Sequence, residues 1–94
     1  MSSLTELRAK LETEAERCYS WSNGPGDVYT EHTHPYTKVL YCVEGAIDFV
    51  LPERVLHLAA GDRMELPAGT PHSARVGPAG CVCVEGRRRT MDRE

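Results

Sequence analysis

Glycine and proline interrupt residues 24–80 at short intervals, and this spacing limits the possible folds more than any other feature of the chain. Between the interruptions lie short runs rich in valine, tyrosine, leucine and isoleucine, at residues 28–34, 37–44, 46–51, 54–58, 63–66, 72–76 and 81–85. Short β-like runs separated by regular turns predict an all-β sandwich or barrel. The pair Glu44-Gly45, between two of the runs, predicts a tight hairpin.

The first residues show a helical period instead. Ser3 and Glu6 have the spacing of a capping box. An apolar stripe recurs at helical intervals and is formed by Leu4, Leu7, Leu11 and Ala15. A helix of about 14 residues is too weak to stand free, so it must dock on something. We therefore expect a helix in residues 1–17, a β-barrel in 18–86 and a charged tail in 87–94.

Length and charge limit the class of protein. A chain of 94 residues forms one domain with a small core, which favours extra stabilisation from a bound metal ion, a second subunit or both. The net charge of −3 argues against nucleic-acid binding, and Arg87-Arg88-Arg89 is interpreted as part of a solvated tail. The sequence has no apolar stretch of about 20 residues and no signal-peptide pattern, so we expect a cytoplasmic protein that does not bind membranes.

The cysteines are expected to be free thiols, because a cytoplasmic compartment is reducing. They are Cys18, Cys42, Cys81 and Cys83. Cys81 and Cys83 are two apart and share one face of a strand. These thiols could be soft metal ligands or, in the case of Cys42, a reactive group; small core residues are the favoured interpretation.

The histidines carry the strongest functional signal. His32 and His34 are two apart in a strand-like run, so their side chains project from the same face. His72 lies far along the chain and must come from a different strand. Three neutral imidazoles that leave coordination positions open are typical of a catalytic rather than a structural metal site. A His-x-His pair alone is weak evidence, because exposed strand histidines produce it by chance.

The spacing around His32 and His34 resembles the first motif of the cupin family. That motif is a glycine, five residues, His-x-His, three or four residues, glutamate, six residues and glycine. This chain has Gly26, five residues, His32-Thr33-His34, three residues, Lys38, six residues and Gly45.

The second cupin motif is a glycine, five residues, Pro-x-Gly, two residues, histidine, three residues and asparagine. Here Gly61, Pro67, Gly69 and His72 match, and Val76 replaces the asparagine. The resemblance implies a single-domain cupin, that is, a double-stranded β-helix or jelly-roll barrel, preceded by the N-terminal α-helix. It also implies that His32, His34 and His72 hold one divalent transition metal ion, which could be Zn, Ni, Fe or Mn.

The main departure is Lys38, which stands where the family has a metal-binding glutamate. Two unit charges 4 Å apart interact by about 4 kcal/mol at an effective dielectric of 20, and a dication doubles the repulsion. Lys38 must therefore be turned away or neutral, or else the site holds no metal. Lys38 is a candidate catalytic base or a binder of a substrate carboxylate. The favoured alternative places it at the barrel mouth with its head in water.

Strand parity makes a further prediction. If Lys38 faces inward, then Leu40 and Cys42 do too, while Val39, Tyr41 and Val43 form an outward apolar row. That row needs cover by the helix or by a second subunit, and we expect a homodimer.

Two functional hypotheses remain open. One is a metal-dependent enzyme of dioxygenase or isomerase type acting on a small molecule. The other is a non-catalytic barrel that binds or senses a small molecule, without metal if Lys38 displaces the ion. His57 is expected to be exposed, and Tyr19 and Trp21 are expected to pack the barrel.

Overall fold

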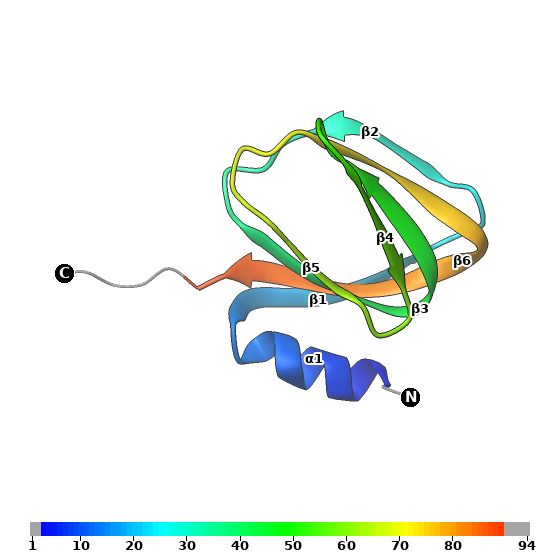
Figure 1. Ribbon diagram of the computed structural model, residues 1–94. Helices are drawn as coiled ribbons and strands as arrows, with labels where there is room; N and C mark the ends of the chain where they lie inside the picture. The colour runs from blue at the N-terminus through cyan, green and yellow to red at the C-terminus, as the bar shows by residue number, and fades with distance from the viewer. Residues whose placement is uncertain (1–2, 90–94) are drawn as a thin grey trace.

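The computed structural model describes residues 3–89 and shows an all-β fold preceded by one helix (Figure 1). The elements in chain order are α1 (Leu4–Glu12), β1 (Ala15–Asn23), β2 (Val28–His32), β3 (Lys38–Val50), β4 (Val55–Ala59), β5 (Arg63–Leu66) and β6 (His72–Arg88). Within these residues, no helix is long and apolar enough to cross a membrane.

All the strands belong to one antiparallel sheet. Its hydrogen-bonded order is β1-β6-β3-β4, with β2 also paired to β6 and β5 to β3. The sheet curls into an open barrel, and α1 lies against its outer surface (Figure 1). The long strands β3 and β6 pair with each other. Each shorter strand pairs with one of them, β1 and β2 with β6 and β4 and β5 with β3.

The prediction of a hairpin at Glu44-Gly45 is wrong, because β3 continues through these two residues to Val50. Gly45 has a φ of 74°, and the pairing of β3 with β6 shifts register on both sides of it. A glycine in the left-handed region allows such a bulge without ending the strand. The predicted break after Val76 is wrong for a similar reason, since β6 runs without interruption to Arg88.

The N-terminal helix has the predicted capping box between Ser3 and Glu6, but it ends at Glu12. Ala15 already belongs to β1, so the prediction that it continues the apolar stripe of the helix is wrong. Ala15 nevertheless packs in the same cluster as Leu7 and Leu11. The strand β1 was not predicted, and a register shift between Glu16 and Tyr19 obscures its alternation.

The predicted parity of β3 is confirmed. Leu40 and Cys42 lie in the core inside the barrel. The outward row of Val39, Tyr41 and Val43 packs with Leu7 and Leu11 of α1. The helix therefore supplies the cover that this row needs, and the row no longer argues for a second subunit.

Arg87 and Arg88 were expected in a charged tail, but the structure has them in the sheet. Both residues belong to β6 and pair with β1, and Arg87 also pairs with β3. Arg88 also forms an ion pair with Glu14, at 3.1 Å. The predicted tail is therefore wrong for these two residues, because their backbone completes the sheet. Residues 90–94 lie outside the described part of the chain.

Candidate metal centre

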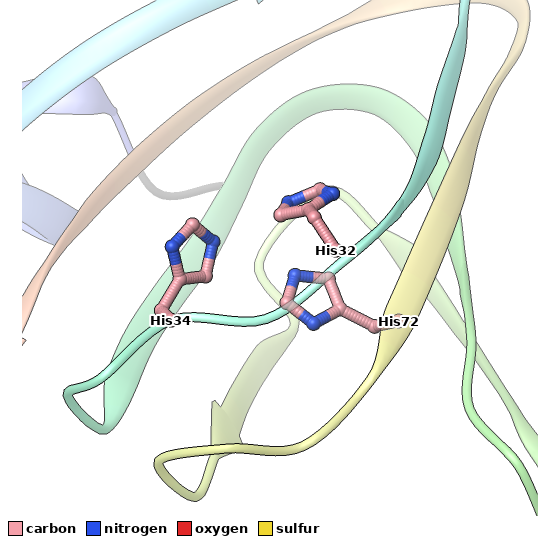
Figure 2. A group of neighbouring side chains, drawn as sticks. All are labelled: His32, His34 and His72. Carbon is pink, nitrogen blue, oxygen red and sulfur yellow. The ribbon is translucent and has the colours of Figure 1, made fainter.

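Three histidines meet inside the barrel. The register of β2 against β6 places His32 directly opposite His72, and their ring centroids are 4.4 Å apart. His34 lies just beyond the end of β2, with its ring 4.9 Å from that of His32. Figure 2 shows the three rings facing a common point from two separate segments. One nitrogen from each ring lies within 4.8 Å of the others, which is compact enough to hold one metal ion.

Hydrogen bonds determine which nitrogen of two rings is free. The Nδ1 atom of His32 lies 2.6 Å from the carbonyl oxygen of Thr30, and that of His72 lies 2.9 Å from the carbonyl oxygen of Thr70. A carbonyl can only accept, so each Nδ1 carries the hydrogen and each Nε2 keeps a lone pair. Metal-binding histidines commonly have this arrangement.

Two of the ring nitrogens are buried without a hydrogen-bond partner. Within residues 3–89, Nε2 of His34 and Nε2 of His72 are buried and have no hydrogen-bond partner. Burial of a polar atom without a partner costs free energy, and such atoms in native proteins usually have an explanation in an unplaced water or ion. The donor set, three imidazole nitrogens, fits a divalent transition metal.

The electrostatics keep two of these rings neutral. Burial lowers the pKa of His34 below its usual value, and the ammonium of Lys38 lowers it further. Burial is also the main cause of the lowered pKa of His72. A neutral imidazole is the form that binds a metal, so both shifts prepare the site for an ion.

The histidines open onto a cavity of about 600 Å³. This volume is in the range of small-molecule sites. Its lining is largely aromatic and apolar, with the charged groups close to the histidines: Tyr19, Trp21, Val28, Tyr29, Thr30, His32, His34, Lys38, Phe49, His72 and Glu85. Trp21 packs against the core of the barrel, as the sequence predicted, and also lines the cavity. Tyr19 lines the cavity and is half exposed, so the packing predicted for it is wrong.

Lys38 does not lie at the barrel mouth with its head in water, so that prediction is wrong. Its side chain is 8% exposed, and Nζ lies 3.5 Å from Oε1 of Glu85, whose side chain is 5% exposed. The carboxylate on β6 offsets the ammonium on β3, because opposite charges this close largely cancel at longer range. The repulsion expected between Lys38 and a metal ion is thereby reduced.

Glu85 lines the cavity and was not singled out from the sequence. Its Oε1 accepts a hydrogen bond from Nε1 of Trp21 at 2.9 Å, and its Oε2 accepts one from the hydroxyl of Tyr19 at 3.0 Å. Burial and the charge of Glu85 raise the pKa of Tyr19 to about 12, so its hydroxyl stays protonated and donates. The inward parity of β6 indicates which way Glu85 points, but only the three-dimensional pairing reveals its partners.

A second contact supports the ring of His34. Tyr36 stacks on it with ring centroids 5.0 Å apart. The guanidinium of Arg87 lies 4.2 Å from the centre of the Tyr36 ring, as a cation–π contact. The stack holds His34 by its ring, whereas His32 and His72 are held by hydrogen bonds from Nδ1.

The other candidates lie away from the site. Cys42, Cys81 and Cys83 are buried in the core, and all four cysteines are free, as predicted. Two causes raise the pKa of the Cys83 thiol: the larger is its contact with the thiol of Cys42, and the second is burial. Among the described residues, the three histidines form the one compact group suited to a metal. His57 is exposed, as predicted, and contacts Asp48 at 2.9 Å.

The comparison with protein families agrees with this geometry. The family model described as "Cupin domain" matches residues 21–90, which include both histidine motifs. The chain belongs to the cupin family.

Relatives of this cupin include an enzyme. Over 72 residues it is 34% identical to quercetin 2,3-dioxygenase from Bacillus subtilis (strain 168). The match covers 74% of this cupin but only 21% of that enzyme, so the chain spans about a fifth of its relative's length.

Solved structures share the fold. KdgF from Halomonas sp. matches with a TM-score of 0.64 and 28% identity, over 77% of this cupin and 68% of that chain. An RmlC-like cupin from Shewanella frigidimarina NCIMB 400 matches with a TM-score of 0.68 and 23% identity, over 80% of this cupin and 67% of that chain. The second likeness concerns the fold alone.

Proposed function

We propose that this cupin binds one divalent transition metal ion through His32, His34 and His72, and that it acts on a small organic molecule held in the adjoining cavity. Zn, Ni, Fe and Mn are the candidate ions. One observation carries the proposal: the buried Nε2 atoms of His34 and His72 have no partner among the described residues and lie at the wall of a cavity of about 600 Å³.

A bound ion would polarise or activate a ligand in its open positions. The chain's own residues prepare that site. The carbonyls of Thr30 and Thr70 fix the tautomers of His32 and His72. The aromatic side chains of the cavity provide apolar surface that binds the body of a substrate and excludes water.

Dioxygenase-type chemistry is the reaction class that we favour. It is supported by the 34% identity to a quercetin 2,3-dioxygenase over 74% of this chain. A barrel that binds or senses a small molecule without turnover is the second candidate. Lys38 favours it, because a buried ammonium occupies the position of the family's glutamate. Oxygen consumption by the metal-loaded protein, measured over a panel of small aromatic substrates, separates the two.

Metal content tests the site itself. We expect about one ion per chain by mass spectrometry in protein purified without a metal-affinity tag and loaded with each candidate ion in turn. His72→Ala should lose the ion because it removes a buried ligand. His57→Ala is the matched control, since His57 is exposed and outside the triad. Equal metal content in the native chain and His72→Ala would contradict the proposal.

A further inference from the structure

Lys38 and Glu85 form a buried charged pair in the wall of the cavity that holds the histidines. Both side chains are more than nine-tenths buried. Neither belongs to the compact group of metal-ligand atoms. A buried ion pair contributes little or nothing to stability compared with apolar residues of the same size. The pair therefore invites a functional explanation.

The hydrogen bonds show that Glu85 does not use up the donors of Lys38. Each oxygen of Glu85 already accepts a hydrogen bond from a neutral donor, Oε1 from Trp21 and Oε2 from Tyr19. The contact from Nζ of Lys38 is 3.5 Å, which is long for a charge-assisted hydrogen bond. An ammonium has three donors, and among residues 3–89 no side-chain hydrogen bond from Nζ of Lys38 is found beside this contact.

The charges of the loaded site also favour an anion. The three imidazoles are neutral when they bind a metal, and Lys38 and Glu85 cancel each other. A divalent ion would therefore leave the cavity with two uncompensated positive charges, since the family's glutamate is replaced. An anionic ligand would be attracted by the ion, and it could accept hydrogen bonds from the donors of Lys38 that Glu85 leaves free.

We propose that Lys38 is a specificity residue that binds the carboxylate of a small aromatic monocarboxylate, with Glu85 as the anchor that holds the ammonium toward the cavity. The inference rests on the proposed function and names its substrate class. The aromatic part of the ligand is set by the walls, where the rings of Trp21 and Tyr29 lie 5.9 Å apart and that of Phe49 lies 6.2 Å from His72. These rings offer flat apolar surface to a flat apolar ligand.

The test compares benzoate with benzamide, which has the same shape and no charge. Binding of each is measured by titration calorimetry on the full chain, both loaded with zinc and free of metal. We expect benzoate to bind about tenfold or more tightly than benzamide, because a hydrogen bond to a charged group is worth about 1.5–3 kcal/mol. The preference should be larger with zinc than without it.

The decisive variant removes both charges together, because Lys38→Met alone would leave Glu85 buried without its counter-charge. In Lys38→Met/Glu85→Gln, the glutamine oxygen can still accept from Trp21 or Tyr19. We expect its preference for benzoate in the metal-free protein to fall to within about threefold. Glu85→Gln alone is the matched control, since it keeps the ammonium and removes the competing carboxylate. It should keep the benzoate preference or increase it.

The outcomes separate the inference from the proposed function. Equal affinities for benzoate and benzamide in the native chain, no benzoate binding at millimolar concentration, or a preference that survives in the metal-free double variant would overturn the inference. Metal content is measured in the same samples. Normal metal content beside a missing preference defeats the inference alone. Absence of metal defeats the proposed function, while the titrations of metal-free protein still test Lys38.

Discussion

Replacing Gly45 with alanine should destabilise this cupin far more than replacing another glycine of its motifs. Gly45 has a φ of +74°, and a Cβ atom there would lie 2.0 Å from the carbonyl oxygen of Gly80 and 2.9 Å from its carbonyl carbon. The left-handed conformation costs alanine about 1–2 kcal/mol. Displacing the backbone of a packed neighbouring segment adds about 1–3 kcal/mol.

The two costs add to about 2–5 kcal/mol, which lowers the melting temperature of a domain this small by roughly 8–40 °C. Gly61→Ala is the matched control. Gly61 also has a positive φ, of +93°, but nothing lies within 4 Å of its added Cβ. It should lose only the conformational part, about 1–2 kcal/mol.

Chemical denaturation of the native chain and both variants measures the difference. The gap between Gly45→Ala and Gly61→Ala isolates the contact with Gly80, because both variants carry the conformational cost. Equal losses in the two variants would refute the close approach of β3 to the Gly80 turn. A small gap accompanied by a changed denaturant slope would instead indicate a change in the unfolded state.

Three further predictions concern charge and assembly. Glu14→Gln should cost about 1–3 kcal/mol, because Glu14 accepts hydrogen bonds from Arg63, Arg88 and Tyr41. The hydrogen bond from Arg63 is the main cause that lowers the pKa of Glu14 below 4.5. The stability that Glu14 contributes is therefore fully present above about pH 4.5 and is lost as the pH falls through the lowered pKa. Denaturation curves at pH 7 and pH 3 should show the difference in stability between the native chain and Glu14→Gln becoming smaller, and a difference independent of pH would contradict this prediction. Lys38→Met should cost about 3–5 kcal/mol of stability, because it leaves the buried Glu85 without its counter-charge. Lys38→Met/Glu85→Gln should recover much of that loss in the same assay. No recovery would show that the two charges are not coupled. A homodimer remains a prediction, which a monomeric mass by light scattering at micromolar concentration would refute.

The sequence predicted the parts of the fold that depend on local chemistry. The capping box at Ser3, the inward parity of Leu40 and the outward row of Val39 follow from short-range periodicity, and the structure has all three. The sequence left open whether the helix or a second subunit covers that row, and the structure shows the helix there. The turn at Gly45 was misinterpreted, because a glycine that ends a strand and one that forms a bulge look the same in sequence.

The candidate site was predictable only in part. The histidines could be singled out because their motif spacing is specific. Glu85 could not, because nothing local indicates that it lies beside Lys38, Tyr19 and Trp21; that arrangement depends on the pairing of β6 with both β1 and β3. The same pairing changes the meaning of Lys38, from a group expected in water to half of a buried pair.

Nitrogen NMR of the imidazole rings, during a titration with zinc, tests the central claim most directly. The structure predicts that one equivalent of zinc shifts the Nε2 resonances of His32, His34 and His72. Nδ1 of His32 and His72 should keep its proton, because each donates a hydrogen bond to a backbone carbonyl. His57 should not respond, because it lies outside the group. Loss of the proton from Nδ1 of His32 or His72, or a response confined to His57, would contradict a three-histidine metal centre.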